Sequence, residues 1–295
     1  MFDLRYHVAS LAAVFLALVV GILVGVGISG RGFVDDAERD RLNEDIAELR
    51  DQRDAAVGEI DDLRRRQEAA QEFVEGAYPV LVEDRLAGKR VAVLVVGSFD
   101  STLEVVTDVV AESGGELARV RAVRVPLPVD DVEQTMAANE DFGDYVGEDE
   151  LGNLGRDLGR ELVRGDETPL WDALSGELVE QRAFESAEEA DAVVVIRSVE
   201  PQQRDTARFL AGLYSGVASL GKPAVGVEQS RVEQSAIPTF QRHLPSTVDG
   251  VETPVGKLSL VLLLGGANEG DYGVRDTAED FLPPIEPLPE SPGGG

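Results

Sequence analysis

Three carboxylates follow predicted strands at positions where a ligand could bind. Each comes just past the carboxyl end of a strand, and each has a serine nearby: Asp100 with Ser98, Glu200 with Ser198, and Glu228 with Ser230. In open α/β sheets the carboxyl ends of the strands share one edge, and ligands bind along it. The pattern predicts a polar site able to hold a cation or a basic group, and ordinary polar loops are the alternative.

Few side chains of this sequence could bind a soft or borderline metal ion. The chain has no cysteine, which excludes disulfides, thiolate metal sites and cysteine catalysis. Its two histidines, His7 and His243, are isolated, and Met136 is the only interior methionine. His243 therefore joins the strand-end carboxylates as a candidate metal ligand.

The familiar catalytic and nucleotide-binding motifs are missing from the sequence. The first predicted strand is followed by Gly97-Ser98-Phe99-Asp100, which is neither a GxGxxG loop nor a P-loop. No HExxH or GxSxG motif occurs. We therefore expect neither enzyme activity nor a bound cofactor.

The charge balance narrows the range of partners. The chain carries 56 acidic and 27 basic residues, a net charge of −29. Such a surface repels phosphate backbones, so no nucleic acid partner is expected. A heavily solvated acidic surface is the simplest interpretation.

An apolar segment predicts a membrane anchor over residues 1–30. Residues Val8–Ile28 hold no charge, and a helix of that length, about 32 Å, crosses a bilayer core. A cleaved signal peptide is the alternative, but its apolar region is usually shorter. Small side chains recur every four residues through Gly21 and Gly25, which favours close packing of two spans. The short N-terminal tail favours a cytoplasmic tail and an extracytoplasmic C-terminal domain.

A heptad repeat then predicts a coiled-coil stalk over residues 31–78. Apolar residues alternate spacings of four and three across more than four heptads. The large ones are Leu42, Ile46, Leu49, Ile60 and Leu63. Arg53 and Gln67 occupy a positions of the same seam. The 3.5-residue period favours self-association as a parallel dimer over a lone helix packed on its own domain.

Strand and helix patterns alternate over residues 79–282. Strands are expected at Arg90–Val96, Glu116–Val125, Asp191–Ile196, Pro223–Val227 and Leu258–Leu264. Arg119 and Arg121 should lie on a solvent-exposed face of the second strand. Helices are expected at Thr102–Glu112, at Gln202–Leu220 and in an insertion over residues 130–188. The order predicts an α/β domain with a mostly parallel, Rossmann-like sheet covered on both faces. Residues 283–295, rich in Pro and Gly, are expected to be disordered.

Three segments of the sequence resemble a known family. They are the N-terminal FDLRYHVASLAAVFLALVVGILVGVGIS, the stalk with Leu49-Arg50-Asp51-Gln52-Arg53-Asp54, and STVDGVETPVGKLSLVLLLGG towards the C-terminus. Together they resemble the actinobacterial copper transport protein MctB family over nearly the whole chain. The stretch from Leu4 to Leu18 is the most specific part of the resemblance.

The resemblance implies a membrane-anchored protein of the cell envelope with a role in copper homeostasis and copper efflux. Copper sites favour thiolate, thioether and imidazole ligands, of which this chain has few, so we expect it to act through an assembly or a partner. Members of the family have also been linked to daughter-cell separation. The alternative is therefore a non-catalytic envelope scaffold, or a regulator of cell separation, that recruits an envelope protein partner. The expected partners are the membrane and further copies of the chain.

Overall fold

Two compact units make up the protein, Met1–Ala70 and Gln71–Gly295. The computed structural model describes residues 4–29 and 33–287, with side chains described for residues 6–27 and 38–287. Most of the predicted N-terminal tail, part of the predicted boundary near residue 30 and the end of the predicted disordered tail lie outside these ranges. Residues 283–287 contain neither helix nor strand.

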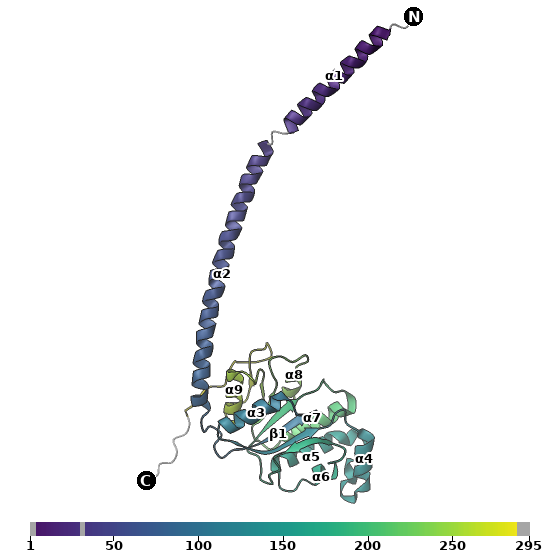
Figure 1. Ribbon diagram of the computed structural model, residues 1–295. Coiled ribbons are helices and arrows are strands. Elements are labelled where there is room, and N and C mark those ends of the chain that lie inside the picture. The colour runs from purple at the N-terminus through teal and green to yellow at the C-terminus, as the bar shows by residue number, and fades with distance from the viewer. Residues whose placement is uncertain (1–3, 30–32, 288–295) are drawn as a thin grey trace. The chain divides into compact units, whose positions relative to one another are not determined.

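Helices make up the described part of the first unit. Helix α1 spans Leu4–Ser29, and its segment Tyr6–Gly27 is long and apolar enough to cross a membrane. Helix α2 spans Phe33–Val82 without a break, through Gly58 and Pro79 (Figure 1). The predicted apolar N-terminal helix is therefore confirmed.

The second unit is built around one seven-stranded sheet of order β3-β2-β1-β4-β5-β6-β7. The strands are β1 Arg90–Val96, β2 Glu116–Val123, β3 Val179–Ala183, β4 Ala192–Arg197, β5 Ala224–Val227, β6 Ser246–Val248 and β7 Asp271–Tyr272. All neighbouring pairs are parallel except β2 with β3. The mostly parallel sheet predicted from the alternating pattern is confirmed.

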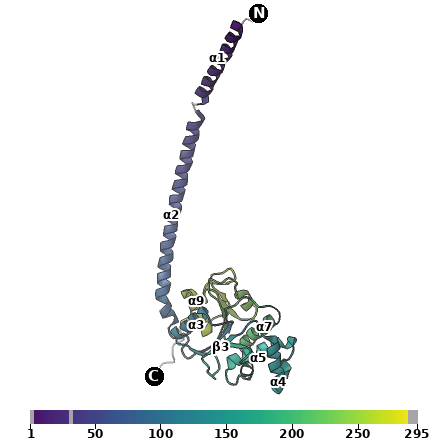
Figure 2. The same ribbon diagram turned by 45° about the vertical axis from the view of Figure 1, so that its right-hand side comes forward.

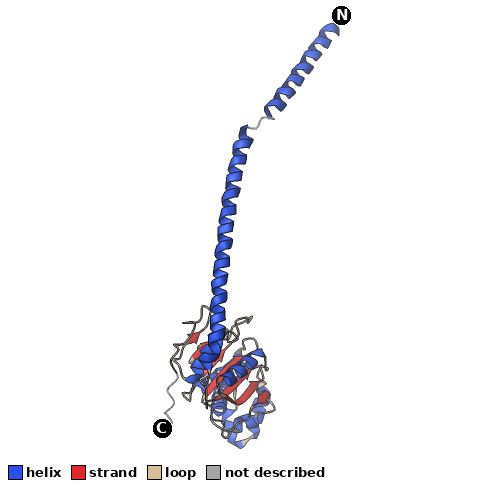
Figure 3. Cartoon of the chain, turned by 60° about the vertical axis from the view of Figure 1, so that its left-hand side comes forward, coloured by secondary structure: helices blue, strands red, loops and turns tan. Residues whose placement is uncertain are grey.

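Helices cover both faces of this sheet, so the second unit has three layers. Its helices are α3 Ser101–Glu112, α4 Val129–Ala138, α5 Leu151–Arg164, α6 Pro169–Ala173, α7 Arg204–Ala218, α8 Ile237–Phe240 and α9 Pro254–Gly265. Two 3₁₀ helices, η1 Glu140–Tyr145 and η2 Glu148–Glu150, join α4 to α5. Figures 1 and 2 place α3 and α9 on one side of the sheet and α4, α5 and α7 on the other. The strands, red in Figure 3, lie between these layers.

Each face of the sheet has its own apolar core because successive strand residues point to opposite faces. On β1, Leu94 belongs to the core under α5 and α7, with Leu158 and Phe209. Its neighbour Val93 belongs to the core under α3 and α9, with Val109. The β1 strand is buried on both sides, as its unbroken apolar run predicted.

Glycines hold α5 and α7 unusually close together. A Cβ on Gly155 would collide with the carbonyl oxygen of Phe209, and one on Gly159 with that of Leu213. In the reverse direction, a Cβ on Gly212 would meet the backbone of Gly152. Both helices therefore carry small-xxx-small faces that bring backbone against backbone, a pattern that was predicted only for the N-terminal apolar helix.

One predicted strand is a helix. Leu258–Leu264 forms most of α9. Thr253 is the N-cap of this helix and accepts a hydrogen bond from the Gly256 N–H, and Pro254 opens the first turn. Gly266, in the left-handed region, ends the helix. The run is apolar on every side because the helix is buried on nearly every side, and such a run has no period that separates helix from strand.

The remaining differences are strands β6 and β7, which were not predicted, and the surroundings of β2. The insertion over residues 130–188 is largely helical, but it also holds β3, an antiparallel edge strand that was not predicted. Arg119 and Arg121 are 1% and 4% exposed, so the prediction of a solvent-exposed face is wrong. Both strand faces are covered, and the Arg121 guanidinium lies over the Trp171 ring at 5.1 Å from its centroid.

Candidate functional site

A cavity of about 460 Å³ opens where β1, β4 and β5 end. Its lining includes Asp100, Glu200 and Glu228, the three carboxylates expected to share one sheet edge. The volume lies within the range of small-molecule sites. The structure therefore brings the predicted polar residues together, while Ser98 and Ser230 stay outside the lining.

Asp100 forms the start of α3. Its carboxylate accepts a hydrogen bond from the Thr102 N–H at 2.9 Å and a longer one from Leu103 at 3.4 Å. It is therefore an N-cap, which satisfies two of the free N–H groups of the helix. Gln229, after β5, donates to the Ser101 hydroxyl at 2.9 Å and links that loop to the same helix turn.

The loops after β1 and β4 are tied to each other at the cavity wall. The Ser198 hydroxyl donates to the Ser98 carbonyl oxygen at 2.7 Å, and the Ser198 N–H donates to Val96. Gly97 has φ of +107°, and a Cβ there would collide with Ser198. The glycine is thus required by this close approach of the two loops.

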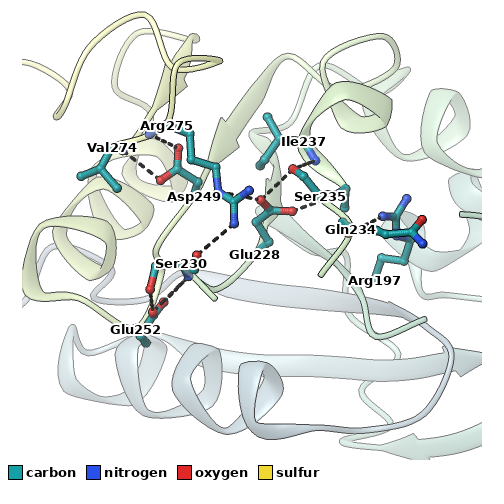
Figure 4. Close-up of polar contacts among 11 residues, drawn as sticks. Arg197, Glu228, Ser230, Gln234, Ser235, Ile237, Asp249, Glu252, Val274 and Arg275 are labelled. Atoms are coloured by element: carbon teal, nitrogen blue, oxygen red, sulfur yellow. Dashed lines mark hydrogen bonds and ion pairs between the residues drawn. The ribbon is translucent and has the colours of Figure 1, made fainter. Parts of the chain in front are cut away.

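Glu228 is the most buried of the three carboxylates and is already paired. It accepts hydrogen bonds from the Ser235 hydroxyl at 2.7 Å and the Ala236 N–H at 2.6 Å. Arg275 forms an ion pair with it at 3.4 Å and also donates to the Ser230 carbonyl oxygen at 2.9 Å (Figure 4). The carboxylate thus holds the loop after β5 in place.

Arg197, at the end of β4, supplies a half-buried positive charge to the lining. Its guanidinium donates to the Gln234 carbonyl oxygen at 3.0 Å, and within the described residues it has no ion-pair partner. Burial lowers the pKa of this guanidinium. Arg197 was not predicted as a site residue, because it closes an apolar strand and belongs to no motif.

Three of the four candidate metal ligands, Asp100, Glu200 and Glu228, share the cavity lining, and His243 does not. Over the described ranges, no group of three or more His, Asp or Glu residues is arranged to hold a metal ion. His243 is absent from the cavity lining and stands beside Tyr214, with ring centroids 6.2 Å apart. Burial lowers the pKa of its imidazole, and nearby Arg242 adds to this. A cation site at these residues stays a prediction.

Comparison with known proteins shows which family the chain is similar to. Residues 1–283 match the family described as "Copper transport outer membrane protein, MctB". The chain belongs to the MctB family. The match includes the apolar helix α1, all of α2 and the whole sheet, so the resemblance noted in the sequence is confirmed. The protein is therefore a membrane-associated envelope protein with one apolar N-terminal helix.

Individual relatives match over a shorter stretch. Proteins named "Copper transporter MctB" from Mycobacterium tuberculosis and Mycobacterium bovis are 34% identical over 116 residues, 39% of this chain. The matched segment spans 35% of the length of these MctB relatives. The names of the family and of these relatives refer to copper transport.

Proposed function

We propose that this chain is a membrane-anchored component of copper transport across the cell envelope, and that it works as an assembly of several copies. The observation that carries the proposal is the match of residues 1–283 to a copper transport family. Copper is the cargo in this proposal.

The need for an assembly follows from the single candidate span. One apolar helix cannot line a polar path, because a pore wall needs several helices or a closed barrel. Within the described residues, Tyr6–Gly27 is the one segment with the length and composition of a span. Gly21 and Gly25 lie in that segment with open space where a Cβ would sit, which leaves room for a second span.

The exposed seam of α2 supports the same view. Leu42, Leu49 and Leu63 are each more than half exposed, and Ile46 and Ile60 are 43% and 53% exposed. Burying one large apolar side chain contributes roughly 1.5–3 kcal/mol before ordering costs. We infer that α2 forms a coiled coil with further copies of itself.

The donor chemistry argues for copper passing along a partner or assembly. Soft and borderline copper sites use thiolate, thioether or imidazole groups. The chain has no cysteine, two histidines and two methionines. Met136 is fully buried in an apolar core and His243 is partly buried against Tyr214. These residues do not form the ligand set of a copper chelator.

The α/β unit supplies the recognition surface in this proposal. We infer a Rossmann-like unit, because the order β3-β2-β1-β4-β5-β6 is that of doubly wound sheets, with an antiparallel β3 as its departure. The order reverses between β1 and β4, and the cavity with Asp100 and Arg197 opens there. Ligands of such sheets bind at this position. An envelope partner or a small polar ligand fits the mixed charge of the cavity.

The unit is placed outside the cytoplasmic membrane in this proposal, and proteolysis tests the placement. A protease added to intact spheroplasts should digest residues 79–282. Digestion only after lysis would place the unit in the cytoplasm instead.

Copper sensitivity of a deletion strain tests the function itself. The strain should accumulate copper and grow poorly in copper, and the parent chain should restore growth. Ile46→Asp with Ile60→Asp places charges in the seam and should fail to restore it. Ala55→Asp with Ala69→Asp adds the same charges at exposed positions outside the seam and should succeed. Normal copper content in the deletion strain would refute the proposal.

A further inference from the structure

Helix α2 carries a charge pattern that specifies how a second copy would lie. In the heptad frame, Ile46 and Ile60 are a residues and Leu49 and Leu63 are d residues. The positions flanking this seam, e and g, hold few charged residues. Asp45, Glu59 and Arg66 lie at g positions, and Arg50 and Arg64 lie at e positions.

Most of these flanking charges have no ion partner among the residues that the structure describes. Within the described residues Asp45, Arg50 and Glu59 take part in no ion pair. Arg64 approaches Asp61 at 3.9 Å, and that arginine side chain is 66% exposed. The seam and its flanking charges are therefore both available to another helix.

We propose that two copies pair through α2 as parallel helices in register over Leu42–Ala70. Asp45 then faces Arg50 of the second copy, and Glu59 faces Arg64 of the second copy. In a parallel pair each g residue lies opposite the e residue five positions later on the other chain. This inference deepens the assembly in the proposed function and rests on it only for the presence of more than one copy.

Other arrangements lose these pairs. Sliding one helix by a heptad places Asp45 opposite Val57 and Glu59 opposite Gln71 on one side of the pair. On the other side of the same shifted pair, Arg64 lies opposite Arg66. In an antiparallel pair g faces g and e faces e, so the carboxylates can meet only Arg66, in at most two attractive contacts, whereas the parallel in-register pair makes four. The parallel in-register pair is the arrangement in which both charged contacts are attractive.

The polar residues within the seam favour the same register. In register, Arg53 meets Arg53 and Gln67 meets Gln67 of the second copy, which leaves each isoleucine opposite an isoleucine. Each Arg53 is held by the adjacent Asp54, whose carboxylate accepts from the arginine Nε at 2.9 Å, and this offsets the repulsion. A one-heptad shift would instead bury the Arg53 guanidinium against Ile60.

The intermolecular seam ends where the last turns of α2, which belong to the second unit, pack within that unit. The heptad frame continues through Val74, Ala77 and Leu81, but Leu81 packs against the core under α3 and α9. Tyr78, at the next e position, donates to Glu112 at 2.9 Å and lies under Lys257. The last turns of α2 thus pack against residues of their own chain. The second helix must therefore leave the seam near Val74.

Cysteine crosslinking of the full chain in membranes tests the arrangement, because the chain has no cysteine of its own. Leu49→Cys and Leu63→Cys place thiols in the seam, and a copper-free oxidant such as diamide should convert most of each variant to a disulfide dimer. Ala55→Cys, an exposed c position, should stay at least fivefold less crosslinked. Ala77→Cys continues the seam but should also stay monomeric.

A charge exchange tests the register. Arg50→Glu should lower the Leu49→Cys dimer yield severalfold, and adding Asp45→Arg should restore it. Failure of the double exchange to restore the yield, or equal crosslinking of Ala77→Cys and Leu63→Cys, would overturn the proposal. Crosslinking of a mixture of Leu49→Cys and Leu63→Cys chains chiefly to each other would reveal an antiparallel pair. These outcomes are independent of copper content in cells, which tests the proposed function.

Discussion

The Arg119 guanidinium lies where Gly165 would carry a side chain. Gly165 ends α5 with φ of +74°, and a Cβ there would overlap the arginine Nη atoms. The guanidinium donates to the Leu162 carbonyl oxygen at 2.5 Å and to that of Ser186 at 2.7 Å. A buried cation thus binds the negative end of α5 and ties the segment after β3 to it.

Gly165→Ala should therefore destabilise the second unit by about 2–4 kcal/mol, because a left-handed alanine and a steric clash add together. Unfolding of the full chain by denaturant in detergent, followed by the fluorescence of the single, buried Trp171, measures this. Gly176→Ala, which has open space and an ordinary φ, is the matched control and should change stability by less than about 0.5 kcal/mol. Equal stability of both variants would show that Arg119 moves aside freely.

The close α5–α7 contact gives a second prediction. Gly155→Ala should destabilise the protein by about 1–3 kcal/mol, since the new methyl group meets the backbone of Phe209 and Leu213. Gly152→Ala, one turn earlier on α5, meets only atoms at 3.8 Å or beyond and should be tolerated. The same Trp171 unfolding curve reports both, and a tolerated Gly155→Ala would mean that the two helices can separate.

Removing Arg275 should expose the dependence of Glu228 on its ion pair. The Glu228 side chain is 3% exposed, so Arg275→Ala leaves a buried carboxylate with two hydrogen bonds and no cation. We expect a loss of about 1–3 kcal/mol, and a smaller effect when Glu228→Gln is already present. Arg242→Ala, at an exposed arginine that follows α8, serves as the control. Additive losses in the double variant would contradict the coupling.

Glu161 should make stability depend on pH. Burial raises the pKa of its carboxyl from 4.5 to about 7, against hydrogen bonds from the Leu170 and Trp171 N–H groups that lower it. Between these values the folded protein holds a proton that the unfolded chain has released, so stability falls as pH rises through the window. Glutamine does not titrate, so the Glu161→Gln variant loses this linkage between folding and proton binding. The denaturant concentration at its unfolding midpoint should therefore fall less than that of the parent from about pH 5 to about pH 8. Identical pH profiles would exclude this role.

Copper titration of the purified full chain forms the last prediction. Isothermal calorimetry with Cu(I) and with Cu(II) should show weak binding without defined stoichiometry, because the chain has no thiolates and only two histidines, far apart in the sequence. A saturable one-to-one site of submicromolar affinity would contradict this expectation. His243→Ala, Asp100→Asn and Glu228→Gln would then identify the ligands.

Local patterns in the sequence were sufficient for the elements that need no distant partner. The charge-free run around Gly21 and Gly25 predicts the apolar helix by length alone, and the β1 run predicts a strand buried on both faces. The heptad spacing from Leu42 to Leu63 likewise indicates an apolar seam without reference to any other segment. The meeting of Asp100, Glu200 and Glu228 at one cavity followed from the rule that parallel strands end together.

Only the tertiary structure decided what lies on each side of an element. Leu258–Leu264 is a helix because apolar neighbours surround it, and its sequence carries no period that could reveal this. Arg119 is buried because carbonyl groups from α5 and from residues 186–188, far apart in the sequence, meet its guanidinium. Glu228 is paired because Arg275, beyond β7, folds back over the end of β5. Burial and pairing depend on contacts between distant segments, and a local pattern does not contain those contacts.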